Sequence, residues 1–236
     1  MEEKKHYTAI VLAAGMGTRM KSDVPKQFMQ LCGHPLVYYS LLAFEKSAVD
    51  DIVLVTGESE RSYCQKEIVD RYGLTKVRSI VSGGRERYLS VYEGLKAAEG
   101  ADYVLIHDGA RPLVGEKEIA DSMESVAKEK ACVIGTLVKD TIKVADEQEY
   151  AQATPQRSRL WAVQTPQSFS YDLLMHAYKE MFAQQEGKSA SVPVTDDAML
   201  VEQFTGHKVR LIHGRYENIK VTTSGDLQIA ELFLKK

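Results

Sequence analysis

Residues 7–19 read YTAIVLAAGMGTR, so an apolar run passes directly into a loop that contains two glycines. A short, continuous apolar run of this kind predicts a strand that is buried on both faces of a sheet. Glycines at the carboxyl end of such a strand let backbone N–H groups approach an anion closely, and open α/β sheets bind ligands at this edge. The segment therefore predicts an α/β fold with a phosphate-binding loop after its first strand.

Apolar runs of the same kind alternate with amphipathic stretches along the first part of the chain. The predicted strands are Tyr7–Leu12, Ile52–Val55, Val77–Val81, Tyr103–Ile106 and Cys132–Leu137, and the predicted helices are Pro35–Lys46, Glu60–Tyr72, Glu86–Ala98 and Glu116–Lys128. This alternation predicts a three-layer, Rossmann-like α/β domain with a mainly parallel, twisted sheet. We expect residues 1–236 to form one domain, because α/β proteins of this size are often built around a single core.

The alternation stops after Lys139. Residues 140–165 are polar, lack a helical period and contain two short alternating pieces, Thr141–Ala145 and Leu160–Gln164. We expect this segment to project from the domain as a β-arm. The remaining pattern predicts a helix over Tyr171–Gln184, a linker over 187–193, a helix over Thr195–Phe204, strands near Lys208–His213 and Ile219–Thr222, and a helix over Ser224–Leu234.

Composition limits the class of partner. The net charge of −3 gives no large positive field for nucleic acid, and no apolar run approaches the ~20 residues that a membrane span needs. The first residues lead straight into the first strand rather than into a signal sequence. The cysteines Cys32, Cys64 and Cys132 form no disulfide pattern, so we expect them to pack in the interior. These features predict a cytoplasmic protein with small-molecule partners, without nucleic acid or membrane.

Two cations, Arg19 and Lys26, lie on either side of the first loop. A dinucleotide-binding loop requires a third small residue where Met20 stands and an acidic residue about 20 positions further on, and both are missing. The Gly-x-x-x-x-Gly-Lys-Ser/Thr pattern of a P-loop is also absent. A plain strand turn with surface charges is the remaining alternative, and the added cations favour phosphate binding over it.

The motif His107–Pro112 follows the predicted strand Tyr103–Ile106 and includes a carboxylate, Asp108. It should lie at the same sheet edge as the first loop if the two strands are neighbours. Mg²⁺ typically takes one or two protein carboxylates beside substrate phosphates, which makes Asp108 a candidate metal ligand. A turn or helix-capping aspartate is the alternative, but the nearby Arg111 favours the metal site.

Seven motifs, taken together, resemble a known family. They are Ala13–Arg19 with Pro25–Gln27, Gly83–Arg87 with Ser90, His107–Pro112, Asp140–Lys143, Thr165–Gln167, Thr195–Ala198 and Asn218–Thr222. In this order they are similar to the nucleotide-diphosphate-sugar-type nucleotidyltransferases, and specifically to the 2-C-methyl-D-erythritol 4-phosphate cytidylyltransferases of the non-mevalonate isoprenoid route. The resemblance covers nearly the whole chain. It implies transfer of a cytidylyl group from CTP to a polyol phosphate with release of pyrophosphate, and a homodimer formed through the arm.

The resemblance also implies roles for individual residues. Those for CTP are Ala13, Ala14, Gly15, Gly17, Thr18, Arg19, Lys26, Gly83, Gly84, Ser90, Asp108, Gly109 and Ala110, and those for the acceptor are Arg111, Thr141, Arg157, Thr165, Thr195, Glu217 and Lys220. Arg19, Lys26, Arg157 and Lys220 would be catalytic, and Asp108 would hold Mg²⁺. The family usually has aspartate at the position of Glu217.

Other interpretations remain open at this point. Ribitol-5-phosphate cytidylyltransferases share several motifs, although Asp140–Lys143 and Thr195–Ala198 are closer to the erythritol enzymes. A non-catalytic nucleotide-binding regulator is an alternative from another class. We expect His107 to be structural, because a phosphate nucleophile is largely ionised at pH 7 and needs no base. The acids of 116–124 and 196–197 are expected on solvated faces or helix starts, and Asp226 in a helix cap.

Overall fold

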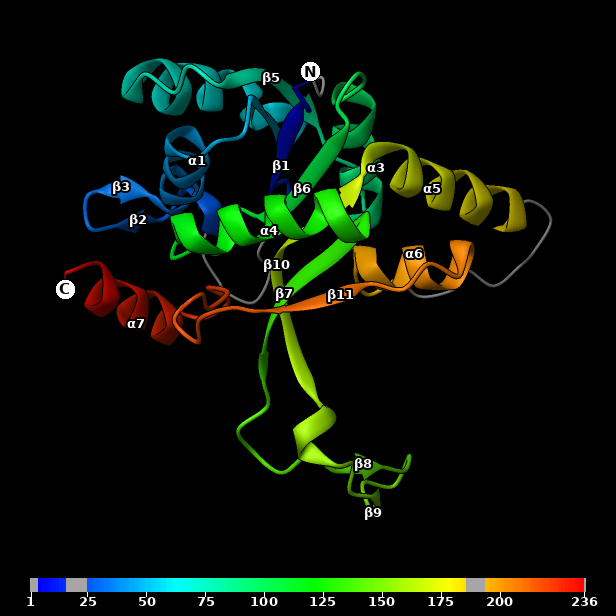
Figure 1. The fold of residues 1–236 in the computed structure, drawn as a ribbon. Helices are drawn as coiled ribbons and strands as arrows, with labels where there is room; N and C mark the ends of the chain where they lie inside the picture. Colours follow the sequence, from blue (N-terminus) through cyan, green and yellow to red (C-terminus); the bar gives the residue numbers. More distant parts are fainter. Residues whose placement is uncertain (1–3, 16–24, 186–193, 236) are drawn as a thin grey trace.

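Seven strands form the central sheet in the order β11-β7-β10-β6-β1-β4-β5 (Figure 1). The computed structural model describes residues 4–15, 25–185 and 194–235. The strands are β1 (Tyr7–Ala13), β4 (Asp51–Thr56), β5 (Val77–Ser82), β6 (Tyr103–Asp108), β7 (Ala131–Leu137), β10 (Trp161–Ser170) and β11 (Arg210–His213). Only β10 runs antiparallel to its neighbours β6 and β7; the other pairs are parallel. The predicted mainly parallel sheet is confirmed.

Helices cover both faces of the sheet because the strands alternate their apolar side chains between two cores. Ile10 and Val53 face α3 (Arg87–Ala97), α5 (Tyr171–Gln185) and α6 (Asp197–Thr205), whereas Val11 and Leu54 face α1 (Leu36–Lys46) and α4 (Glu116–Glu129). A third, smaller cluster joins α7 (Ser224–Leu234) to α1 and to the short strand β2 (Gln30–Leu31), which pairs with β3 (His34–Pro35). The predicted three layers are confirmed.

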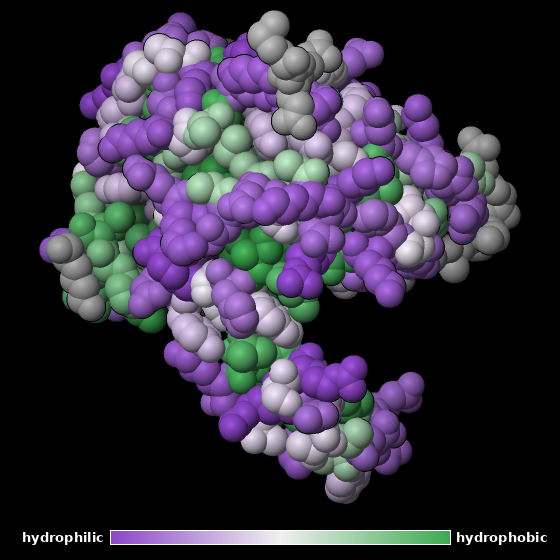
Figure 2. All heavy atoms as spheres, in the orientation of Figure 1, coloured by the Kyte–Doolittle hydropathy of each residue, from purple (hydrophilic) through white to green (hydrophobic). Residues whose placement is uncertain are grey.

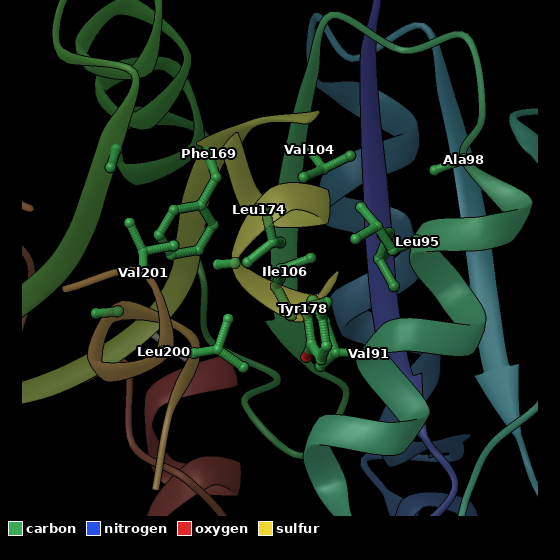
Figure 3. Close-up of a cluster of buried hydrophobic side chains, with 14 of the residues drawn as sticks. Val91, Leu95, Ala98, Val104, Ile106, Phe169, Leu174, Tyr178, Leu200 and Val201 are labelled. Carbon is green, nitrogen blue, oxygen red and sulfur yellow. The ribbon is translucent and has the colours of Figure 1, made fainter. Parts of the chain in front are cut away.

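The first core fixes the relative positions of α3, α5 and α6. Figure 3 shows Val91 of α3, Tyr178 of α5 and Leu200 of α6 together with Phe169 of β10 in this cluster. The Tyr178 hydroxyl also donates a hydrogen bond to the backbone oxygen of Tyr88, at 2.9 Å. The amino-terminal ends of α3 and α6 are therefore set by buried packing.

The arm projects from the body as predicted (Figures 1 and 2). It carries β8 (Val144–Ala145), β9 (Ala151–Ala153) and a short 3-10 helix, η5 (Arg157–Arg159). The expectation that Leu160–Gln164 belongs to the arm was wrong, because these residues lead into β10, which pairs with β6 and β7 in the main sheet. Residues 164–168 of this buried strand are mostly polar, so the strand lacks the apolar run that predicts the other strands.

Other predicted elements also differ from the structure. The segment Ile219–Thr222 is not a strand, although the Val221 N–H donates to the oxygen of Ala110 at 2.8 Å. The predicted helix Glu60–Tyr72 is irregular: it comprises η3 (Glu58–Glu60), α2 (Arg61–Tyr63) and a π-helical stretch, η4 (Cys64–Asp70). α6 begins two residues later than predicted, after the cap Asp196. The predicted linker 187–193 lies outside the described residues.

Smaller expectations were tested as well. The helix cap at Asp226 is confirmed as a capping box with Thr223 at the start of α7. Cys64 and Cys132 are buried as predicted, but Cys32 is exposed, so the prediction was wrong for that residue. Within the described ranges, no helix combines the length and the apolar character needed to cross a membrane.

Truncation of the shared core should be costly. Phe169→Ala is expected to lower the free energy of unfolding by about 3–5 kcal/mol, because it leaves a cavity between the sheet and its helices. Leu232→Ala, at a side chain that is 67% exposed on α7, should change it by less than about 0.5 kcal/mol. Urea unfolding measures both. Equal effects of the two changes would contradict this description of the core.

Candidate active site

A cleft of about 860 Å³ opens at the carboxyl edge of the sheet. Its walls come from the ends of β1, β4, β5 and β6 and from the segment before α7. The lining residues are Leu12, Ala13, Ala14, Gly15, Pro25, Lys26, Gln27, Gly57, Ser59, Glu60, Gly83, Gly84, Arg85, Glu86, Arg87, Ser90, Asp108, Ala110 and Lys220. Most of the residues expected to bind the nucleotide thus share one cleft. Gly17, Thr18 and Arg19 lie outside the described residues.

The turn from β5 into α3 is packed too tightly for side chains. The backbone N–H of Gly83 donates to the oxygen of Thr56 at 2.8 Å. A Cβ on Gly83 would lie 2.5 Å from the Ala14 Cβ and 2.6 Å from the Ser90 Oγ, closer than real atoms allow. The Ser90 Oγ accepts a hydrogen bond from the Gly84 N–H at 3.1 Å. This wall of the cleft is therefore narrow and rigid.

A short 3-10 helix, η2 (Lys26–Phe28), contributes Lys26 and Gln27 to the lining of the cleft. The buried Gln27 donates from Nε2 to the oxygen of Ala13 at 2.6 Å, which ties this helix to the end of β1. The Lys26 Nζ donates to the backbone oxygen of Val221 at 3.4 Å. Lys26 is thereby placed near the segment that carries Lys220.

Asp108 forms the charged floor of the cleft at the end of β6. Its Oδ2 lies 2.7 Å from the Lys220 Nζ, and its Oδ1 accepts from the Arg87 Nε at 3.2 Å. The side chain is only 11% exposed, and burial alone would raise its pKa. The charges of Arg87 and Lys220 outweigh this effect and hold the pKa of Asp108 well below its usual range. Asp108 is therefore an anion with two cationic partners.

Arg87 also pairs with a carboxylate that the sequence did not single out as buried. Its Nη2 lies 2.9 Å from the Oδ2 of Asp197, which is 0% exposed at the start of α6. The helix start expected for Asp197 is confirmed, because α6 begins at this residue. Its full burial was not expected, and an arginine from another helix compensates its charge. The solvated face expected for the acids of 116–124 was wrong for Glu118 of α4, which is buried and lies 2.6 Å from the Nε of Arg215.

His107 is fully buried beside this floor. Its Nδ1 lies 2.9 Å from the Thr165 Oγ1, and its Nε2 lies 3.2 Å from the oxygen of Arg111. Burial lowers the pKa of His107 to about 4, so the ring is neutral at pH 7. These contacts support the structural role expected for His107.

The residues expected to bind the acceptor are more dispersed. Arg111 donates from Nη1 to the oxygen of Asn218 at 2.7 Å, and Thr165 accepts at Oγ1 from the Asp108 N–H at 3.1 Å. Thr195 is exposed before α6, and Glu217 lines a separate hollow. None of these four side chains lines the cleft.

Thr141 and Arg157 are also outside the cleft, because both are exposed on the arm. The Arg157 Nη1 donates to the oxygen of Lys139 at 3.1 Å. Within the described ranges, one chain thus brings most of the residues expected for the nucleotide to the cleft, whereas Thr141 and Arg157 are not part of the cleft lining.

A divalent cation fits the donor set at the cleft floor. The described part of the chain holds no group of three or more His, Cys, Asp or Glu side chains arranged around a common point. Magnesium does not require such a group, because it binds through one or two carboxylates, waters and phosphate oxygens. The ionised, buried carboxylate of Asp108 is a suitable oxygen donor of this type.

Residues that sequence analysis gave no role also shape the site. Arg87, Gln27 and Gln167 belong to motifs of the family resemblance, which implies no individual role for them. The Gln167 Oε1 accepts from the backbone N–H groups of Asp197 and Ala198 at 3.0 and 3.1 Å. Their motif membership was the available signal, but it did not identify their partners.

Acid should weaken the fold through His107. As the pH falls from 7.5 to 4, an unfolded histidine gains a proton, whereas the buried His107 is mostly neutral until the pH approaches its own pKa of about 4. The contribution of His107 to stability therefore decreases as the pH falls. The free energy of unfolding of the wild type relative to His107→Gln should fall by roughly 3 kcal/mol over this range. Urea unfolding at several pH values measures the difference. A difference that does not change with pH would contradict the neutral, buried ring.

Comparisons with known proteins agree with this geometry. Residues 7–236 match the model of the 2-C-methyl-D-erythritol 4-phosphate cytidylyltransferase family. Proteins of that name from Lachnoclostridium phytofermentans and Lachnospira eligens are 46% and 48% identical to the chain; each alignment covers 97% of the chain, with 96% and 99% of the relatives.

A solved structure shows the same similarity in three dimensions. The 4-diphosphocytidyl-2C-methyl-D-erythritol synthase from Anaerococcus prevotii superposes with a TM-score of 0.85 at 33% identity, over 98% of this chain and 97% of that one. Both the family match and these identities extend over nearly the full sequence. The chain therefore belongs to the 2-C-methyl-D-erythritol 4-phosphate cytidylyltransferase family of nucleotidyltransferases.

Proposed function

We propose that the chain transfers the cytidylyl group of CTP to 2-C-methyl-D-erythritol 4-phosphate, giving 4-diphosphocytidyl-2-C-methyl-D-erythritol and pyrophosphate. The observation that carries this proposal is the cleft in which Gly83, Ser90, Lys26, Asp108 and Lys220 lie together. Family membership supplies the identity of the two substrates.

In the proposed reaction, an oxygen of the acceptor phosphate attacks the α-phosphorus of CTP in line with the leaving group. The bond between the α-phosphorus and its bridging oxygen breaks, and pyrophosphate leaves with the electron pair. The acceptor phosphate is largely dianionic at pH 7, so no residue needs to remove a proton from it. The neutral, buried ring of His107 is consistent with a reaction that has no general base.

Catalysis then depends on positioning two anions and on stabilising the charge of the transition state. We assign the triphosphate to Lys26 and to Arg19, which follows the first loop. Lys220 is assigned to the reacting phosphates. In the structure its Nζ is paired with Asp108 at 2.7 Å, so it must exchange this carboxylate for a phosphate when the substrates bind.

We propose that Asp108 holds Mg²⁺ together with the triphosphate. Magnesium, when bound, neutralises charge on the phosphate oxygens and orients them. When Lys220 moves to a phosphate, Asp108 loses one of its two cationic partners. Its carboxylate would then be available to hold the cation. The narrow turn at Gly83 and Gly84, with the Ser90 hydroxyl, favours a pyrimidine over a purine.

The acceptor side of the site is proposed to be shared between two copies of the chain. Thr141 and Arg157 lie on the arm, which projects from the body of the chain (Figures 1 and 2), and neither lines the cleft. Apolar residues of the arm are also exposed, Tyr150 at 71% and Val144 at 45%. In a two-fold dimer, each arm would bring these residues to the other subunit's cleft. Residues 1–236 would then form one catalytic domain with a dimerisation arm that begins near residue 140 and ends where β10 begins at Trp161.

The cellular setting is also a proposal. All three cysteines are free, which is typical of a reducing compartment. We therefore propose that the protein works in the cytoplasm. A non-catalytic regulator is disfavoured, because the chain retains both Lys26 and Lys220 in the cleft.

The two lysines should be needed for turnover. Lys26→Ala and Lys220→Ala are each expected to lower kcat by on the order of 10²-fold or more, the scale for removing one preorganised donor. Lys117→Ala, at an exposed lysine of α4 outside the cleft, is the control and should leave kcat unchanged. Steady-state kinetics and thermal unfolding are measured together. A near-normal kcat in either variant would remove that lysine from the mechanism.

Complementation should reveal a shared site. Unfolded Lys26→Ala and Arg157→Ala chains are mixed and refolded together. If the arm serves the other subunit, one site of each heterodimer carries both defects and the other carries neither. Random pairing should then restore roughly a quarter of wild-type activity from two nearly inactive parents. Heterodimers verified by mass but without recovered activity would show that each chain builds its own site.

The reaction itself is tested by a pyrophosphate-release assay. CTP is supplied with 2-C-methyl-D-erythritol 4-phosphate or with ribitol 5-phosphate, and the first acceptor is expected to be used far better. Replacing CTP with ATP or GTP should nearly abolish release. The family comparisons do not favour the ribitol substrate. Faster turnover with ribitol 5-phosphate would overturn the proposed acceptor while leaving cytidylyl transfer in place.

A further inference from the structure

The buried Asp197 has no part in the reaction described above, yet it carries a charge into the core. Its carboxylate is 0% exposed, and burial raises its pKa while Arg87 opposes that rise. In the described part of the chain, neither of its carboxylate oxygens has a hydrogen-bond partner of good geometry, and its Oδ2 forms an ion pair with the Arg87 Nη2 at 2.9 Å. A buried carboxylate with so little compensation lowers the stability of the folded protein, so its presence here requires an explanation.

Arg87 connects this carboxylate to the floor of the cleft. From the first turn of α3, its Nε donates to the Asp108 Oδ1 at 3.2 Å, while its Nη2 lies 2.9 Å from the Asp197 Oδ2. The guanidinium is planar and presents its donors in fixed directions, so one arginine serves both carboxylates at once. Its charge is thus divided between the cleft and the core.

The ion pair is not needed to bring the two helices together. Gln167 of β10 already accepts hydrogen bonds from the backbone at the start of α6, including the Asp197 N–H at 3.0 Å. Leu200 of α6 and Val91 of α3 lie in the same apolar cluster (Figure 3). The fold therefore positions Asp197 without the ion pair, and the charge of Asp197 is not required to hold α3 and α6 together.

The charge of Asp197 affects the charges around Asp108. Asp108 has two cationic partners, Arg87 and Lys220, and each of them reduces the negative charge that a divalent cation would meet. Asp197 draws Arg87 toward the core and so weakens one of these two interactions. Without Asp197, the whole charge of Arg87 would act on Asp108.

We propose that Asp197 is a positioning residue for the nucleotide site: by sharing Arg87 with Asp108, it keeps Asp108 able to take a divalent cation together with CTP. This inference rests on the proposed role of Asp108. It extends the site to a residue that touches neither substrate nor metal. It also explains why Arg87, rather than a lysine, stands between the two carboxylates.

The test measures CTP binding without acceptor, so that no turnover occurs. Equilibrium dialysis with radiolabelled CTP gives the dissociation constant in saturating Mg²⁺ and in EDTA, and their ratio is the factor by which magnesium tightens binding. Asp197→Asn should lower this factor roughly fivefold or more, the scale of coupling between charged residues in contact. Arg87→Met combined with Asp197→Asn should restore it, because neither charge then acts on Asp108.

A matched control removes a different buried ion pair. Glu118→Gln, on α4, breaks the ion pair with Arg215. This change should lower stability but leave the magnesium factor unchanged. If Asp197 were only structural, Asp197→Asn would behave like this control, and the inference would be wrong. A double variant that stays as impaired as Asp197→Asn would also overturn it.

Two further outcomes are separable. If the Asp197→Asn variant does not fold, the Arg87→Lys variant is measured instead, because a single ammonium cannot bridge both carboxylates. A lowered magnesium factor in this variant supports the inference, and an unchanged magnesium factor overturns it. If magnesium fails to tighten CTP binding by the wild type, the proposed metal role of Asp108 is wrong and the inference falls with it. A normal wild-type factor that Asp197→Asn leaves unchanged removes the inference alone.

Discussion

The ion pair between Asp108 and Lys220, with Arg87 as the second partner of the carboxylate, is the interaction on which the site depends. It joins the end of β6, the segment before α7 and the start of α3, three parts of the chain that are far apart in sequence. A buried carboxylate is stable in this position only because the two cations compensate it. The same three charges are those that a triphosphate with a bound cation would rearrange.

β10 supports this arrangement from behind. Its polar side chains are buried and form hydrogen bonds with neighbouring elements. The Thr165 Oγ1 accepts from the Asp108 N–H of β6, and the Gln167 Oε1 accepts from the Asp197 N–H at the start of α6. The Asn218 Nδ2 donates to the oxygen of Thr165 at 2.9 Å, which positions the segment that carries Lys220. One antiparallel strand thus orients the carboxylate, the lysine and the helix that holds Asp197.

The sequence predicted those features that depend on local pattern. The parallel strands, most helices, the arm and the glycine loop follow from short runs of residues, and the family motifs named most of the cleft. β10 was missed because its buried polar residues are stabilised by partners up to 58 positions away in the chain. Burial of Asp197 depends on Arg87 of another helix, and Ile219–Thr222 has the alternation of a strand but lies outside the sheet. Such features depend on contacts that no window of sequence contains.

A crystal structure with CTP, Mg²⁺ and no acceptor tests the central claim most directly. The account predicts a cation at about 2.1 Å from an Asp108 oxygen, and a Lys220 Nζ that has left this carboxylate for a phosphate of CTP. The Arg87 ion pair with Asp197 should persist. A structure in which Lys220 stays paired with Asp108 while the cation and the triphosphate bind elsewhere would contradict the account.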